Sequence, residues 1–276
     1  MSRVERVWEV ETELGEGPLW SAAEQALYWL DIENPRVFRY TPASGARETF
    51  PVPEEIGSIA LRRGGGLVAA GRSGFHFLEV ERGALEPIAD PEPDLAGNRF
   101  NDGECDACGR FWAGTMDDAC RAPSGALYRL DPDRTVTRMD AGYAVTNGPA
   151  FAPDGRTMIH NDTTRGRVYA FDLDLATGAI ANKRVFAAIP AADGLPDGVT
   201  FDAEGFLWLA HWGGARLTRF APDGTIERVV TVPAENVTSC AFGGPELATL
   251  YVTTATAGLF AFEPGVVGLP AATYAG

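Results

Sequence analysis

The chain has 276 residues, 45% of them hydrophobic, and a formal net charge of −15. A chain of this length and composition can bury a sizeable core, and we expect one domain over residues 1–276. So negative a surface repels a polyanion, which argues against nucleic acid as a partner. No apolar stretch reaches the length of a membrane span, and the first residues lack the apolar segment of a signal peptide. We therefore expect no membrane insertion and no export.

Four cysteines, at positions 105, 108, 120 and 240, bear on the redox compartment. Cys105 and Cys108 have C-x-x-C spacing, but Cys120 and Cys240 do not supply the second pair that a structural zinc site needs. We therefore expect reduced thiols and a cytoplasmic protein.

Short strands separated by turns follow one another along the chain, which contains 32 glycines and 19 prolines. A first strand is predicted within residues 4–10. Six groups of strands follow, at 16–40, 58–78, 101–130, 147–171, 197–220 and 238–262. No amphipathic helical pattern of useful length interrupts them. Repeats of roughly 40–50 residues with several short strands each indicate a β-propeller of about six blades.

A ring of blades has to close on itself. The simplest closure pairs the strand within residues 4–10 with the sixth blade, because this leaves no open sheet edge. The predicted fold is therefore all-β, a six-bladed β-propeller closed by its N-terminal strand. A β-sandwich is the alternative, but a sandwich would not repeat one polar residue at a fixed distance from one turn.

A polar residue opens the first strand of several groups. Three of these openers stand 8 residues before a turn glycine: Asn101 before Gly109, Asn147 before Gly155 and Asp197 before Gly205. Glu16 fills the same place in a looser copy. Because the first strand of a propeller blade lines the central channel, all four openers are expected at the channel mouth. Oxygen-bearing side chains without His or Cys favour a hard divalent cation such as Ca²⁺, Mg²⁺ or Mn²⁺. The capping of turns and strand ends is the alternative role.

Motifs for other chemistries are missing from the sequence. It contains no H-E-x-x-H motif, no glycine-rich phosphate loop before a helix, and no G-x-S-x-G elbow, since the run 71–74 does not fit. Two of the three histidines, His160 and His211, follow the second strands of their blades, close to the expected pocket. We interpret both as wall or core residues rather than as catalysts.

At these residues the chain resembles the senescence-marker-protein/gluconolactonase (regucalcin-like) family of sugar lactonases. The resemblance rests on the runs 14–18, 98–103, 114–116, 146–149, 196–198 and 238–244, which span essentially the whole chain in the family's order. It implies a six-bladed propeller that binds one divalent metal ion (Ca²⁺, Zn²⁺, Mn²⁺ or Mg²⁺) and hydrolyses a sugar lactone to the aldonic acid.

The resemblance also implies roles for three of the openers. Glu16, Asn147 and Asp197 correspond to the metal ligands, and Asp197 would double as the general base. In the expected mechanism the metal polarises the lactone carbonyl, and Asp197 takes a proton from the attacking water.

Substrate contacts are implied at four further positions. Arg99 and Asn101 would hold substrate hydroxyls, with Asn101 able to reach the metal through water. An acidic residue after the Gly-Thr-Met run contacts substrate in some members, which makes Asp117 and Asp118 the candidates here. The expected partner is a small sugar lactone, and the expected state is a monomer.

Two other functions fit the same predicted metal site. Related propellers hydrolyse phosphotriesters or aryl esters, and the metal chemistry suits those substrates equally well. A non-enzymatic calcium-binding propeller, in which the ion only ties the blades together, is the third possibility.

Overall fold

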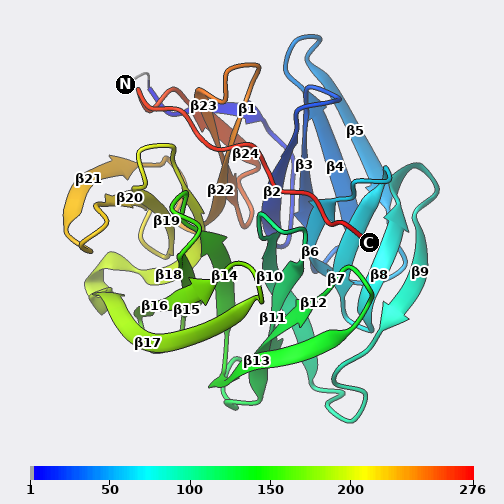
Figure 1. Ribbon diagram of the computed structural model, residues 1–276. Helices are drawn as coiled ribbons and strands as arrows, with labels where there is room; N and C mark the ends of the chain where they lie inside the picture. The colour runs from blue at the N-terminus through cyan, green and yellow to red at the C-terminus, as the bar shows by residue number, and fades with distance from the viewer. Residues whose placement is uncertain (1–2) are drawn as a thin grey trace.

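A computed structural model describes residues 3–276 of the chain. Over this range it contains 24 β-strands and two single-turn 3₁₀ helices, η1 (Val80–Arg82) and η2 (Ala191–Asp193). The strands form six antiparallel sheets of four strands each, which stand as blades around a ring (Figure 1). The all-β, six-bladed β-propeller predicted from the sequence is confirmed. Within residues 3–276 no helix has the length and apolar character needed to cross a membrane.

The first three blades each use consecutive strands, ordered from the ring axis outward. Blade one consists of β2 (Gly15–Ser21), β3 (Ala26–Asp31), β4 (Arg36–Thr41) and β5 (Ala46–Pro51). Blade two consists of β6 (Ile56–Leu61), β7 (Leu67–Gly71), β8 (Gly74–Glu79) and β9 (Ala84–Ala89). Blade three consists of β10 (Asn98–Cys105), β11 (Phe111–Asp117), β12 (Gly125–Leu130) and β13 (Val136–Tyr143).

The last three blades follow the same plan, except that the sixth borrows a strand from the N-terminus. Blade four consists of β14 (Thr146–Phe151), β15 (Thr157–Asp162), β16 (Arg167–Asp174) and β17 (Ala179–Ala188). Blade five consists of β18 (Leu195–Phe201), β19 (Leu207–Trp212), β20 (Arg216–Phe220) and β21 (Ile226–Thr231). Blade six consists of β22 (Val237–Gly243), β23 (Thr249–Thr254), β24 (Leu259–Phe262) and β1 (Glu5–Trp8).

The turns predicted after the inner strands form as expected. Gly109, Gly155 and Gly205 have positive φ angles of 81°, 65° and 82°, which glycine adopts without steric cost. In blade five the turn begins at Asp202, whose carboxylate accepts a hydrogen bond from Trp208 Nε1 at 3.0 Å. The turn thereby fixes the next strand with its tryptophan inside the protein.

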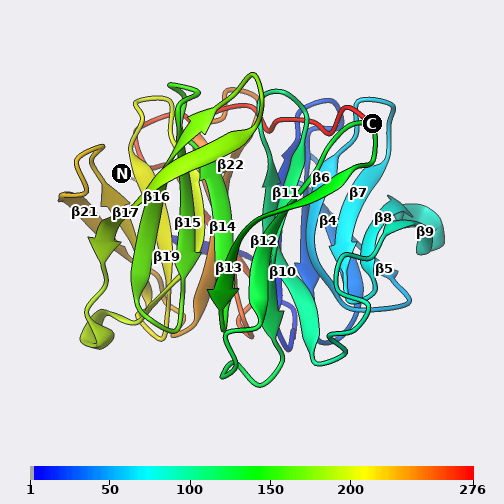
Figure 2. The ribbon, with the colours of Figure 1, turned by 60° about the horizontal axis from the view of Figure 1, so that its bottom comes forward.

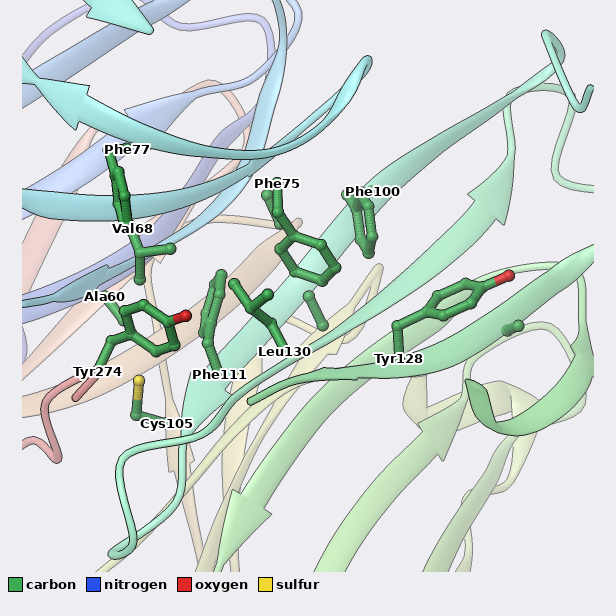
Figure 3. Packing of buried hydrophobic residues seen from close by; sticks show 13 residues of the cluster. Ala60, Val68, Phe75, Phe77, Phe100, Cys105, Phe111, Tyr128, Leu130 and Tyr274 are labelled. Atoms are coloured by element: carbon green, nitrogen blue, oxygen red, sulfur yellow. The ribbon is translucent and has the colours of Figure 1, made fainter. Parts of the chain in front are cut away.

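Hydrophobic clusters between neighbouring blades hold the ring together. Figure 3 shows the cluster between blades two and three, where aromatic side chains from both blades meet. The Phe75 ring lies 4.5 Å from that of Phe100 and 5.9 Å from that of Phe111, measured between centroids. Tyr274, near the end of the chain, joins the same cluster.

The N-terminal strand lies where the predicted closure requires it. β1 pairs antiparallel with β24, with Glu5 opposite Ala261. Trp8, the last residue of β1, is buried and packs edge-to-face against Trp29, with 5.6 Å between ring centroids. The pairing is observed; that the ring depends on it stays a prediction, which truncation can test.

We propose that the chain forms one domain and expect deletion of residues 1–10 to destabilise all of it. The deletion exposes the edge of β24 and removes the buried Trp8; losing a tryptophan from a core costs about 3–5 kcal/mol. Thermal unfolding followed by circular dichroism should show one transition at a lower temperature. Deletion of residues 1–4, which spares β1, is the control. A truncated protein that melts like the full chain would contradict the prediction, and two separate transitions would contradict the single domain.

The segment after β24 was not anticipated from the sequence. It crosses the end of the ring opposite the openers, and it is drawn in red in Figure 2. Backbone hydrogen bonds join it to three blades besides the sixth: Ala203 N to Val267 O at 2.9 Å, Tyr274 N to Leu61 O at 2.8 Å, and Ala275 N to Gly109 O at 3.0 Å. The end of the chain therefore ties blades two, three and five together.

Candidate active site

The four openers lie at the same end of their inner strands and are buried. Glu16 is in β2, Asn101 in β10, Asn147 in β14 and Asp197 in β18, and each side chain belongs to a residue no more than 7% exposed. The pairing register of all four strands shifts at or just after the opener. Such bulges turn side chains out of the regular alternation of a strand, which allows adjacent residues at the strand start to border the channel mouth.

A chain of hydrogen bonds links the amide openers across the blades. Arg99 Nη1 donates to Asn101 Oδ1 at 2.9 Å. Asn101 Nδ2 donates in turn to Asn147 Oδ1 at 3.1 Å. Asn147 Nδ2 donates to Thr163 Oγ1 at 2.9 Å, and that hydroxyl donates to Pro196 O at 2.8 Å, immediately before Asp197. The structure therefore brings Arg99, Asn101 and Asn147 together in one network.

The two acidic openers, Glu16 and Asp197, have pKa values above those of free carboxyl groups. Burial, and then the neighbouring Asp102 carboxylate, raises the pKa of Glu16 to about 8. Burial, then Glu16 and then Asp102, raises the pKa of Asp197 well above its usual range. Since like charges in a buried site disfavour ionisation of each other, these carboxylates must either keep protons or share a positive ion.

Asp102 is a site residue that the sequence analysis did not single out. Its Oδ2 accepts a hydrogen bond from Gly148 N at 2.7 Å and its Oδ1 from Gly103 N at 2.8 Å. Burial raises the pKa of its carboxyl to about 6, against the effect of these two hydrogen bonds. One signal was available: the residue after the opener is glycine in the other three copies, and only blade three carries a carboxylate there.

The oxygen donors fit a hard divalent cation, although they do not form a cluster of acids alone. Among the residues that the structure describes, no three His, Cys, Asp or Glu side chains are placed to hold a metal ion. The predicted metal ligands are the carboxylates of Glu16 and Asp197 and the amide oxygen of Asn147. Carboxylate and amide oxygens are ligands that Ca²⁺, Mg²⁺ and Mn²⁺ accept, and a bound cation would offset the burial that raises the pKa values of both acids.

The pH dependence of stability should report the raised pKa of Glu16. Between the usual pKa of 4.5 and the value of about 8 in the fold, Glu16 is ionised in the unfolded chain and protonated in the folded one. The unfolding free energy of the metal-free protein should therefore fall as pH rises through this window. Urea unfolding of wild type and Glu16→Gln from pH 4.5 to 8.5 isolates the contribution, since the variant lacks it. Equal pH slopes in the two proteins would contradict the assignment.

The two acids after the Gly-Thr-Met run have different surroundings. Asp117 Oδ2 accepts hydrogen bonds from Arg121 N and Ala122 N, each at 2.9 Å, and so caps the loop that follows β11. Asp118 faces arginines instead, with Oδ1 at 3.9 Å from Arg99 Nε. Of the two candidates, Asp118 is therefore the one beside the predicted substrate-binding arginine.

Both histidines are buried, in line with their interpretation as wall or core residues. His160 is fully buried and meets the Tyr143 ring edge-to-face at 5.0 Å, and burial lowers its pKa to about 3. His211 shares a hydrogen bond between Nδ1 and Asp193 O at 2.9 Å, and burial lowers its pKa to about 4. Both rings are therefore neutral near pH 7.

Below the openers, a cavity of about 100 Å³ follows the inner strands. Asp102 and Glu104 line it, and 269–272 of the C-terminal segment borders it as well. Burial, with a contribution from Asp102, raises the pKa of Glu104 to about 8. Carboxyl groups therefore line the channel below the openers as well.

A sequence profile described as the SMP-30/gluconolactonase/LRE-like region matches residues 14–256. The chain belongs to this family. The pentonolactonase XacC of Haloferax volcanii is 39% identical to it over 91% of this chain and 85% of the relative. The 6-deoxy-6-sulfogluconolactonase of Pseudomonas putida is also 39% identical, over 87% of this chain and 83% of the relative. The crystal structure of a calcium-binding regucalcin from Agrobacterium tumefaciens superposes with a TM-score of 0.91 at 28% identity, covering 98% and 96% of the two chains.

These comparisons confirm the resemblance noted in the sequence. Relatives of this SMP-30/gluconolactonase family member are named as sugar lactonases, which supports hydrolysis of a lactone as its general activity.

Proposed function

We propose that this SMP-30/gluconolactonase family member hydrolyses a sugar lactone to the aldonic acid with the help of one divalent metal ion. The observation that carries the proposal is the meeting of two buried acids and two linked amides at one end of the ring. Lactonase activity in two relatives that are 39% identical supports it.

Glu16, Asn147 and Asp197 would hold the ion, which is Ca²⁺, Zn²⁺, Mn²⁺ or Mg²⁺ in this proposal. A bound cation at this place would polarise the lactone carbonyl and stabilise the negative charge on its oxygen. The hydrogen bond from Asn101 Nδ2 to Asn147 Oδ1 holds the amide group of Asn147 in place.

Asp197 is proposed to take a proton from the attacking water. It is a buried carboxylate near the start of β18, and a carboxylate held in place beside the substrate can serve as a general base. Asn161 Nδ2 donates to the backbone oxygen of Asp197 at 2.6 Å and so fixes this part of β18. Ring opening then leaves an aldonate, whose departure is favoured by the net charge of −15 on the chain.

Arg99 and Asn101 are proposed to position the substrate hydroxyls. The Nη1 group of Arg99 donates to Phe100 O at 3.0 Å and to Asn101 Oδ1 at 2.9 Å, which orients the guanidinium. Its Nη2 group would then donate to the substrate. A polyhydroxylated lactone suits these donors better than a phosphotriester or an aryl ester does.

The test is a panel of pentono- and hexonolactones, assayed by acid release with each of the four metals. Turnover of at least one lactone, and much slower turnover of paraoxon and phenyl acetate, is the expected result. Faster hydrolysis of paraoxon or phenyl acetate would favour the ester hydrolase. Tight calcium binding by calorimetry without turnover of any lactone would favour a non-enzymatic calcium-binding protein. The similarity to a calcium-binding regucalcin is the observation behind this alternative.

We also propose a cytoplasmic monomer. All four cysteines are free thiols, as expected in a reducing compartment. Light scattering coupled to size-exclusion chromatography would show a mass near 29.5 kDa for the monomer, and twice that mass would contradict it.

A further inference from the structure

An ion pair between blades two and three stands at the rim of the site. Arg72 lies in the turn between β7 and β8, and Asp118 directly follows β11. The contact is bidentate, from Arg72 Nη1 to Asp118 Oδ2 at 2.9 Å and from Nη2 to Oδ1 at 3.0 Å. Glu55 Oε2 accepts from Arg72 Nε at 2.9 Å on the other side of the guanidinium. Bidentate pairs of this kind fix geometry as well as charge.

The same carboxylate faces the predicted substrate arginine. Asp118 Oδ1 lies 3.9 Å from Arg99 Nε, and the Arg99 side chain is 8% exposed. A buried guanidinium needs a nearby negative charge to offset its desolvation. Asp118 therefore compensates two arginines at once, Arg72 at the rim and Arg99 inside the site.

The acids at this rim outnumber the arginines, so that no positive surplus is left. Arg72 and Arg99 contribute two positive charges, while Asp118, Glu55 and Glu33, the acids that act on Arg99, contribute three negative ones. These five groups therefore carry a net charge of −1. Both arginines also line one cavity of about 250 Å³ between blades two and three, which Asp90 and Glu92 line as well. A substituent that extended from a lactone ring into this cavity would meet two guanidiniums whose charge is already neutralised.

We infer that the Arg72–Asp118 ion pair is a specificity-determining element, which makes the enzyme take neutral sugar lactones and discriminate against lactones that carry an anionic substituent. The inference rests on the proposed function and names the substrate class of that site. Asp118 acts here mainly through the arginines that it neutralises, and Arg72 is a positioning residue that holds Asp118 at its place.

Asp118→Asn tests the inference, because it keeps the shape and removes one negative charge. The matched probes are D-glucono-1,5-lactone and its 6-phosphate, which differ only in the charged substituent. The ratio of kcat/KM for the anionic lactone to that for the neutral one should rise about tenfold or more, as expected for one unit charge removed within a few ångströms at a partly exposed site. The rise should shrink at 0.5 M salt, since salt screens such charges.

Two further variants keep the inference open to contradiction. Glu48→Gln is the matched control, because Glu48 forms a similar bidentate pair with Arg39 on the outer strands of blade one, at 2.8 and 2.9 Å; it should leave the ratio unchanged. Arg72→Gln removes the positive partner and leaves Asp118 in place, so it should lower the ratio and raise KM for the neutral lactone while kcat changes little.

The failure of this inference and that of the proposed function have different signatures. Wild type without activity on any lactone would remove the proposed function. Wild type that hydrolyses lactones but prefers the 6-phosphate, or an Asp118→Asn variant with an unchanged ratio, would overturn the inference alone. A ratio that rises equally in Glu48→Gln would also overturn it, because the effect would then come from the net charge of the protein.

Discussion

Asp197→Asn is expected to lower kcat by about 10²–10⁴-fold while the metal remains bound, because it removes the basic carboxylate and keeps one oxygen donor. Asp197→Ala should lose both turnover and metal affinity. The decisive measurement is kcat of Asp197→Asn at saturating metal, with metal occupancy determined on the same sample. Rate loss with the metal bound supports the role of Asp197 as a base.

A second buried acid provides the control for this experiment. Glu104 lines the channel below the site and has a pKa raised to about 8 by burial. Because its carboxyl is already protonated at neutral pH in the metal-free protein, Glu104→Gln should leave kcat near that of wild type. A wild-type kcat for Asp197→Asn at saturating metal would show that Asp197 is a ligand only, and the base would then lie elsewhere.

Removal of divalent metal is expected to abolish turnover and to lower the melting temperature. A ligand that binds only the folded state stabilises it by about 2.7 kcal/mol at a hundredfold excess over its Kd, and the proposed ligands Glu16, Asn147 and Asp197 come together only in the folded chain. Exhaustive chelation followed by activity assay and calorimetry measures both effects, and restored metal should reverse them.

Glu16→Gln shows whether activity is lost because the metal is removed or because the chelator harms the protein in another way. The variant should bind metal more weakly, so its activity should recover only at higher metal concentrations than wild type needs. An enzyme that stays fully active after chelation would remove the metal from the proposal, including the roles given to Glu16, Asn147 and Asp197.

Periodic features of the fold were predictable because the same sequence pattern recurs in several blades. The spacing of 8 residues between opener and turn glycine places Asn101, Asn147 and Asp197 on inner strands, and the structure places them there. The C-terminal segment was not predictable in this way. It occurs once, has no periodic pattern, and is held by backbone hydrogen bonds that are independent of side-chain type.

Site residues were predictable only where their chemical type alone indicates a role in the site. Asp117 and Asp118 are chemically equal in the sequence, and the backbone of one loop assigns them different partners. Arg72 lies 46 residues before Asp118, in a turn with no motif, so that only the packing of blade two against blade three reveals their pairing. Asp102 was hidden because the strand bulge lets two successive residues, Asn101 and Asp102, take part in the site.

The segment after β24 has a consequence for the assembly of the ring and for the handling of the protein. Tyr274 lies buried in the cluster between blades two and three, and its hydroxyl donates to Asp131 O at 2.8 Å. This segment follows all six blades in the chain, so it can join blades two, three and five only after all of them have been synthesised. A purification tag at the C-terminus would have to emerge directly from packed residues, since Gly276 lies against Pro132. An N-terminal tag would lie ahead of β1, on the side of Arg3, which is exposed, and is the better choice for every experiment described above.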